Sequence, residues 1–307
     1  MELVLDIQHL SKKYGKKTAL EDISFSVKAG TCFGLLGPNG AGKSTTMKIL
    51  TGIVDADNGN VMILGMDSKK HLHSIKQKVG YVPQSITLYE ELNAYDNLLF
   101  FGQMYGVKGK LLQERITKVL TQTGLLDRAK DKVKEYSGGM KRRINIAAAL
   151  LHDPKILILD EPTVGIDPQS RNHIFDMIRA LKEEGVTIIY STHYMEEVEV
   201  LCDDIAIIDN GKIITQGNLK ELLEQYSTKS IYIETDDIEK LKQLIHISKI
   251  TSKNDGWVIE SDQPVDLLQT ILKTTTEQGI KIQALEMMRP TLESVFLSLT
   301  GTSLRDK

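Results

Sequence analysis

Three short and nearly continuous apolar runs organise the first two thirds of the chain. They read "TCFGLLG" (Thr31–Gly37), "KILILD" (Lys155–Asp160) and "VTIIYST" (Val186–Thr192). Strands that are buried on both faces have this composition, and the segments between the runs have the periodicity of helices. We therefore predict an α/β protein with a core of parallel strands.

The patterns on either side of this core predict antiparallel strands. Residues 1–30 alternate between apolar and polar positions, as in "LVLDIQHL" and "ISFSV", which is typical of half-buried strands. The segment Asp203–Gly217 has two strand-like runs around Asn210-Gly211, a preferred pair for a two-residue hairpin turn. We expect antiparallel strands before the core and a hairpin at its end.

The pattern changes near residue 225. The segments that follow alternate as strand, helix, strand, strand, helix, strand and short helix, which suits a small α+β domain of the ferredoxin-like kind. We predict one domain over residues 1–224, with a helical subdomain at about 85–150, and a small accessory domain over residues 229–307. The small domain has no catalytic constellation, so regulation, dimer stabilisation and a structural role stay open for it.

Composition and charge narrow the class of protein. The 307 residues are 41% hydrophobic and 26% charged, with a net charge of −3, so no basic field favours nucleic acid as a partner. No apolar stretch is long enough to span a bilayer, and the first residues do not read as a signal peptide. Cys32 and Cys202 lie in predicted strands and indicate neither a disulfide framework nor a zinc site. We expect a cytoplasmic location.

The segment "GPNGAGKST" has the spacing of a phosphate-binding loop, G-x-x-x-x-G-K-[ST], between a predicted strand and a predicted helix. Its glycines let the backbone N–H groups face a phosphate. The lysine would reach the outer phosphates, and the serine hydroxyl would bind Mg²⁺. The candidate residues are Gly37, Pro38, Asn39, Gly40, Ala41, Gly42, Lys43, Ser44 and Thr45.

Other polar residues follow predicted strands and should meet this loop at the carboxyl edge of the sheet. Asp160 would hold Mg²⁺, and Glu161 would accept a proton from the attacking water. Gln84, after "VGYVP", is placed to contact Mg²⁺ and the water, and His193 to bind the γ-phosphate. This convergence predicts a catalytic edge.

A second anion site is predicted in "EYSGGMKRR" (Glu135–Arg143). The stretch opens a helix with a hydroxyl, two glycines and three cations, and helix starts bind anions through free N–H groups and the helix dipole. Taken alone, the same stretch is a helix whose N-cap is Ser137 and whose basic first turn is solvated.

Together these residues resemble the nucleotide-binding subunit of ATP-binding-cassette transporters, from about Leu3 to Gly217. "GPNGAGKST" is similar to the Walker A loop of that family, "ILILDEP" to Walker B, "VGIDP" to the D-loop and "YSGGM" to the signature motif. Gln84 matches the Q-loop and His193 the switch histidine. The resemblance implies a P-loop NTPase (RecA-like) core with an antiparallel β-subdomain and a helical subdomain.

The resemblance also implies ligands and partners. ATP and Mg²⁺ would bind the Walker loops, and Tyr14 falls where an aromatic ring stacks on adenine. Two cassettes would pack head to tail as a homodimer, so that Ser137, Gly138 and Gly139 bind the γ-phosphate of the ATP that the partner holds. Tyr136 and Met140 depart from the usual Leu and Gln of the signature.

The expected activity is ATP hydrolysis coupled to transport through a separate transmembrane permease. The chain would then sit on the inner face of the cell membrane as a peripheral subunit, docked through the apolar segment Leu88–Gly106. "YSGGMKRR" and the ending "PTLESVFLSLTG" resemble a bacterial subclass that exports drugs, bacteriocins or sodium.

Two alternatives belong to other classes. A soluble cassette ATPase of DNA repair would carry long coiled arms between Lys43 and Ser137. A soluble cassette ATPase that acts in translation usually carries two cassettes in one chain. A small-molecule P-loop kinase would leave "YSGGM", "VGIDP" and His193 unexplained.

Overall fold

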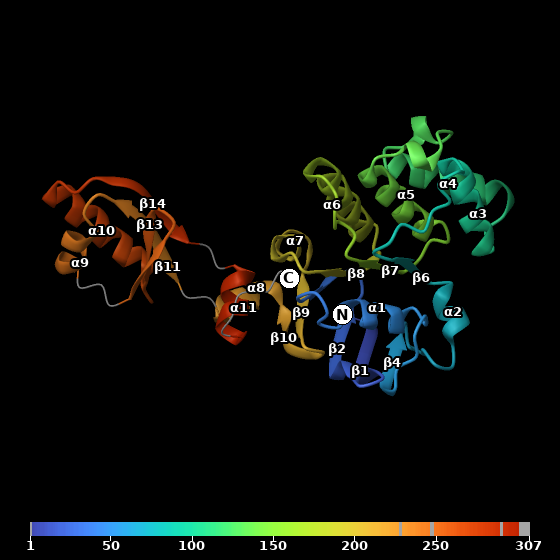
Figure 1. Ribbon diagram of the computed structural model, residues 1–307, viewed down its shortest axis with the longest axis horizontal. Coiled ribbons are helices and arrows are strands. Elements are labelled where there is room, and N and C mark those ends of the chain that lie inside the picture. Colours follow the sequence, from blue (N-terminus) through green and yellow to red (C-terminus); the bar gives the residue numbers. More distant parts are fainter. Residues whose placement is uncertain (1, 227–228, 246–248, 289–290, 301–307) are drawn as a thin grey trace. The chain divides into compact units, whose positions relative to one another are not determined.

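The computed structural model describes residues 2–226, 229–245, 249–288 and 291–300 (Figure 1). Its contacts divide the chain into two compact units, one that ends at Leu219 and one that begins at Lys220. Each unit is built around its own sheet system and its own apolar core. No described helix has the length and apolar character that crossing a membrane requires.

The first unit is centred on a six-stranded sheet in the order β10-β9-β3-β8-β7-β6. Its strands are β3 (Cys32–Leu36), β6 (Val79–Val82), β7 (Ile156–Asp160), β8 (Thr187–Thr192), β9 (Asp204–Asp209) and β10 (Lys212–Asn218). All residues of β3, β7 and β8 are buried, and these strands pair in parallel. Helices α6 (Pro168–Glu183) and α7 (Met195–Leu201) pack on these strands, and α1 (Lys43–Leu50) with the antiparallel sheet described below shares a core with them. The predicted parallel core is confirmed.

The edge strand β10 runs antiparallel to β9 through the predicted hairpin. Asn210 and Gly211 form the turn, with φ angles of 48° and 77°. Positive φ at both turn positions matches the right-handed twist of the two strands, and Asn and Gly accept it at low cost.

A second, antiparallel sheet lies against the first. Its order is β2-β1-β4-β5, and its strands are β1 (Leu3–Tyr14), β2 (Lys17–Lys28), β4 (Asn58–Ile63) and β5 (Met66–Asp67). The alternating positions of β2 place Phe25 in a core shared with the parallel sheet, where its ring stacks on Phe33 of β3 at 5.1 Å. This core fixes the position of the loop that follows β3.

Besides two short 3₁₀ helices, Leu126–Arg128 and Val133–Glu135, the described part of the first unit has seven α-helices. They are α1 (Lys43–Leu50), α2 (Leu72–Lys76), α3 (Ala94–Met104), α4 (Gly109–Gln122), α5 (Gly138–Leu150), α6 (Pro168–Glu183) and α7 (Met195–Leu201). Figure 1 shows α3, α4 and α5 grouped together beside the β6 end of the sheet, and the three helices pack against one another. They form the helical subdomain that the sequence predicts.

The second unit has the predicted ferredoxin-like succession of elements from β11 on, preceded by a helix, α8, that the sequence analysis does not predict. They are α8 (Leu219–Tyr226), β11 (Ser230–Thr235), α9 (Ile238–Ile245), β12 (Ile250–Lys253), β13 (Gly256–Glu260), α10 (Pro264–Gln278), β14 (Ile282–Met288) and α11 (Leu292–Thr300). The sheet is antiparallel, in the order β12-β13-β11-β14, and α9 and α10 pack together. Ile231, Ile233 and Leu241 lie in its core.

One expectation about the cysteines is wrong. The sequence pattern predicts a strand at Cys202, but this residue follows directly after α7, whose buried residues Val198 and Leu201 have helical spacing. The Sγ atoms of Cys202 and Cys32 lie 3.8 Å apart, and both thiols are free and buried. Hydrogen bonding to Cys32 and burial raise the pKa of the Cys202 thiol well above its usual value, which favours the protonated thiol over the thiolate.

The packing of α5 on α6 leads to a prediction of stability. A Cβ atom at Gly139 would lie 2.1 Å from the Oγ of Ser170. Gly139→Ala should therefore lower the free energy of unfolding by about 1–3 kcal/mol, measured by urea denaturation. The control is Gly138→Ala, whose Cβ would lie 3.9 Å from Ile166 and should leave stability within about 0.5 kcal/mol. Equal midpoints for the two variants would contradict this account of the α5–α6 contact.

Candidate functional site

The loop between β3 and α1 is held in a narrow curl. Gly40 and Gly42 adopt φ angles of 82° and 115°, a region that other residues rarely enter. A Cβ at Gly37 would lie 2.1 Å from the carbonyl oxygen of Ile208, so glycine is required there by close approach. Ala41 is buried in the core and anchors the loop, because its carbonyl accepts a hydrogen bond from the N–H of Gly211 at 2.9 Å.

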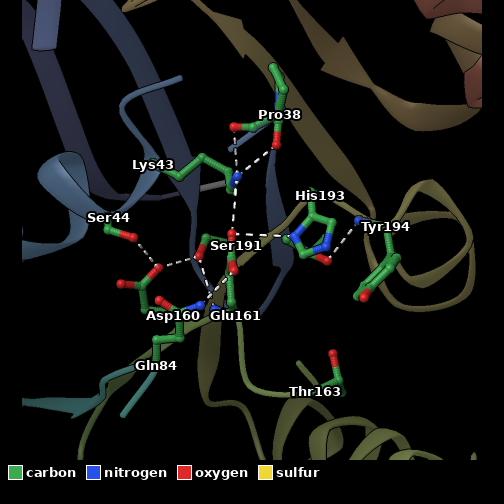
Figure 2. A network of polar contacts seen from close by, with 12 residues as sticks. Pro38, Lys43, Ser44, Gln84, Asp160, Glu161, Thr163, Ser191, His193 and Tyr194 are labelled. Atoms are coloured by element: carbon green, nitrogen blue, oxygen red, sulfur yellow. Dashed lines mark hydrogen bonds and ion pairs between the residues drawn. The ribbon is translucent and has the colours of Figure 1, made fainter. Parts of the chain in front are cut away.

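Lys43 is a buried cation at the centre of this loop. Only 3% of it is exposed, and its Nζ donates to the carbonyl oxygens of Gly37 at 2.6 Å and Pro38 at 3.0 Å (Figure 2). The same Nζ lies 3.1 Å from Oε1 of Glu161, which follows β7. An ammonium group so enclosed by backbone oxygens is positioned to bind an anion that enters the loop.

Asp160 accepts hydrogen bonds from hydroxyl groups on helix α1 and strand β8. Its Oδ1 accepts hydrogen bonds from Ser44 at 3.1 Å and from Ser191 at 2.7 Å (Figure 2). Only 2% of Asp160 is exposed. The carboxylate and the Ser44 hydroxyl are hard oxygen ligands, the donor set that Mg²⁺ prefers.

Side chains that follow β3, β6 and β8 surround the carboxylate of Glu161, which follows β7. Gln84, after β6, donates its Nε2–H to Oε2 at 3.0 Å, and Nδ1 of His193, after β8, lies 3.4 Å from Oε1. Lys43, after β3, contacts the same Oε1. Glu161 has a positive φ of 47°, a strained backbone position of the kind that occurs at functional sites. The side chain is therefore held in one orientation.

A hollow of about 300 Å³ opens beside this cluster. It is lined by Tyr14, Lys17, Ala19, Asn39, Gly40, Gly42, Lys43, Ser44, Thr45, Gln84 and Glu161. Tyr14 ends β1 and is 48% exposed, which leaves its ring accessible at the rim. Flexible glycine backbone, a buried cation, paired oxygen ligands and an exposed ring are the features that a nucleoside triphosphate with Mg²⁺ requires.

The residues of "YSGGM" lie at the start of α5 and are not part of this lining. Ser137 is the N-cap, and its Oγ accepts a hydrogen bond from the N–H of Met140 at 3.3 Å. Tyr136 donates its hydroxyl to the carbonyl of Arg128 at 2.6 Å, and Arg128 donates to the sulfur of Met140 at 3.5 Å. The two departures from the usual signature therefore share one partner.

A buried polar cluster that the sequence did not predict lies behind the site. Glu197 on α7, only 1% exposed, accepts hydrogen bonds from the hydroxyls of Thr163 at 2.6 Å, Tyr190 at 2.9 Å and Thr192 at 2.8 Å. Burial and the Glu197 carboxylate raise the pKa of Tyr190 well above its usual value, so its hydroxyl stays a donor. The cluster joins the loop after Glu161 to the strand end that carries His193.

The fold and the cluster around Lys43 and Glu161 define a P-loop nucleoside triphosphatase. The family model described as "ABC transporter" matches residues 20–164, and the one described as "ATP-binding protein DrrA1-3-like, C-terminal domain" matches residues 217–300. The chain belongs to the ATP-binding subunits of ABC transporters, which bind and hydrolyse ATP to power transport.

The relatives extend along the whole chain. The linearmycin resistance ATP-binding protein LnrL of Bacillus subtilis (strain 168) is 46% identical and spans 99% of this chain and 100% of its own length. A Nod factor export ATP-binding protein I of Ralstonia nicotianae is 37% identical over 99% of this chain and 95% of its own. A solved ATP-binding subunit of an ABC transporter superposes with a TM-score of 0.66 at 31% identity, covering 73% of this chain and 93% of that one.

These similarities confirm the expected function, the ATP-binding and ATP-hydrolysing subunit of an ABC exporter. They do not favour a soluble ATPase of translation or DNA repair.

The Glu197 cluster leads to a prediction. Glu197→Gln places an amide N–H₂ group against hydroxyls that donate to a carboxylate, so it should lower the free energy of unfolding by about 1–3 kcal/mol. Urea denaturation measures the loss. The matched control is Glu196→Gln, one residue earlier and exposed, which should stay within about 0.5 kcal/mol. If the two variants lost equal stability, the cluster would not be the cause.

Proposed function

We propose that Glu161 accepts the proton of the water that attacks the γ-phosphate of ATP. The observation that supports this role is the contact of one buried carboxylate with Lys43, Gln84 and His193. The contacts fix the direction in which the carboxylate presents its lone pairs, which a general base requires. The Gln84 amide would orient the water, and His193 would donate a hydrogen bond to the γ-phosphate.

The loop residues and the hollow beside them would hold ATP. Residues 37–45 would surround the phosphates, with Lys43 exchanging the carbonyls of Gly37 and Pro38 for phosphate oxygens. The exposed ring of Tyr14 would stack on adenine.

Ser44, Gln84 and Asp160 would hold Mg²⁺ together with the substrate phosphates. Among the described residues, no group of three His, Cys, Asp or Glu side chains forms a metal cage, which agrees with an ion shared with the substrate. The bound ion would neutralise charge on the phosphate oxygens.

A second copy of the chain would complete the site. Ser137 and Gly138 are exposed at the N-terminus of α5, where free N–H groups favour a negative ligand. Packing requires glycine at position 139 but not at 138, where a Cβ would meet Ile166 only at 3.9 Å. We take the open surface at Gly138 as the place where Ser137, Gly138 and Gly139 receive the γ-phosphate of the partner's ATP.

Replacing Glu161 tests both the base and the dimer. Glu161→Gln should bind ATP, but its rate of hydrolysis should fall by at least about 100-fold, because the proton acceptor is lost. Light scattering should show this variant as a dimer with Mg-ATP and as a monomer with Mg-ADP. Lys43→Ala is the control that should neither bind ATP nor dimerise. Wild-type turnover in Glu161→Gln would exclude Glu161 as the base.

The signature role is tested in the same background. Gly138→Asp adds a carboxylate at the start of α5. The helix dipole stabilises a negative charge there by about 0.3–1 kcal/mol, but the carboxylate repels a triphosphate. Combined with Glu161→Gln, it should abolish the ATP-dependent dimer while the urea midpoint is retained. A dimer that persists would place the γ-phosphate contact elsewhere.

The membrane subunit is proposed as a separate chain. Phe100 and Met104 on α3, and Tyr89 and Leu92 before it, are 38–70% exposed, and the rings of Tyr89 and Phe100 contact edge to face. This apolar surface is suited to a helix of a transmembrane permease, which would keep the chain on the inner face of the membrane. Export of a compound through such a permease fits the resistance and export functions in the relatives' names.

Affinity purification tests this partner. Tagged Glu161→Gln, purified from detergent-solubilised native membranes with Mg-ATP, should bring down a polytopic membrane protein in stoichiometric amount, identified by mass spectrometry. The matched control carries Met104→Glu and Phe100→Glu, which should lose that protein and keep ATP binding. Recovery of ribosomes or DNA-repair factors instead would contradict the exporter assignment.

A further inference from the structure

The three cations after the signature glycines all bind other groups of the protein. Lys141 forms an ion pair with Glu90 at 2.6 Å, and its side chain is 19% exposed. Arg142 is 3% exposed and donates to the carbonyl oxygen of Pro83 at 2.8 Å and to that of Gln84. The solvated basic turn that the stretch suggests when taken alone is therefore wrong, because two of these cations bind the segment around Gln84.

A further residue of α5 extends this contact. Asn145, one helical turn after Lys141 and 3% exposed, accepts hydrogen bonds at Oδ1 from the N–H of Thr87 at 3.3 Å and from its hydroxyl at 2.9 Å. Because α5 is a rigid helix, positions 141, 142 and 145 share one side of it. That side holds residues 83–90, which we call the Gln84 segment.

Arg142 occupies the central place in this contact. Burial lowers its pKa below the usual range for arginine, while the charge of Asp160 and the Tyr190 hydroxyl act in the opposite direction. A buried guanidinium bound to carbonyl oxygens is costly, and its Nε has no hydrogen-bond partner in the described part of the chain. Proteins often retain a buried charge, despite its cost in stability, where the charge specifies the position of a neighbouring group.

We propose that Arg142 is the positioning residue of Gln84. By binding the backbone carbonyls of Pro83 and Gln84, it places the Gln84 amide against Glu161. Since Arg142 lies one turn and a half beyond Ser137 on the same helix, a phosphate bound at the start of α5 and the Gln84 amide are held by one rigid element. The inference rests on the catalytic role proposed above for Gln84.

The first test compares two neighbouring arginines in the full-length protein. Arg142→Met keeps an apolar stem and removes the donors. Its kcat for ATP hydrolysis should fall about 10- to 100-fold, the effect of a misplaced catalytic group, with KM within about twofold.

Arg143→Met is the control. Arg143 also donates to a backbone carbonyl, that of Thr123 at 2.6 Å, but outside the Gln84 segment. Its kcat should stay within about twofold of the wild type. Equal losses in both variants would overturn the proposal.

A double-mutant cycle separates positioning from general damage. If Arg142 acts through Gln84, then Arg142→Met should slow Gln84→Ala no further, whereas independent effects would multiply. Multiplied effects overturn the proposal even if each single variant is slow. If Arg142→Met does not fold, the cycle is run with Arg142→Lys, which keeps the charge and one donor and should show the same lack of additivity.

The cycle also tests the catalytic role of Gln84 separately from the positioning role of Arg142. Unchanged kcat in Gln84→Ala would refute the catalytic role of Gln84 itself. A slow Gln84→Ala with a multiplied Arg142→Met effect would refute the positioning by Arg142 and leave the role of Gln84 intact.

Discussion

The ion pair between Lys43 and Glu161 is the constraint on which the site depends. The two charges lie 3.1 Å apart, and their side chains are 3% and 6% exposed. Removing one partner of such a buried pair leaves an uncompensated charge and typically costs about 3–5 kcal/mol. The pair exists because β3 and β7 are separated in the sheet by β8 alone, so the loop after β3 reaches the strand end of β7. ATP phosphates would compete with Glu161 for Lys43.

Two buried polar systems hold the groups around this pair. On one side, Arg142 of α5 fixes the backbone of Gln84. On the other, Glu197 of α7 binds Thr163 and Thr192, which flank the loop of Glu161 and the position of His193. Arg142 binds the backbone of Gln84, whose side chain contacts the Glu161 carboxylate. Glu197 binds residues that are close in sequence to Glu161 and His193.

Much of the fold could be predicted from the sequence, because burial leaves a direct pattern there. Runs of apolar residues gave the parallel strands, and Asn210-Gly211 gave the hairpin. The meeting of Gln84, Glu161 and His193 could be expected as well, since carboxyl ends of parallel strands share one edge. The roles of these residues remain proposals, whereas their proximity is a feature of the structure.

Contacts to main-chain atoms, or to residues distant in the sequence, could not be predicted from the sequence. Arg142 binds carbonyl oxygens, which every residue has, so no residue type marks its partner. Tyr136 and Met140 are joined by Arg128, which precedes the signature and carries no motif of its own. The prediction of a strand at Cys202 is wrong because its apolar neighbours fit either a strand or one face of a helix.

The most direct test of the account is the structure of Glu161→Gln with Mg-ATP. We expect two copies of the chain, with each triphosphate contacted by Lys43 and Ser44 of one copy and by Ser137 and Gly138 of the other. Arg142 should remain on the carbonyls of Pro83 and Gln84. A single copy that binds ATP with Ser137 and Gly138 facing solvent, at concentrations where ATP is saturating, would contradict the composite site.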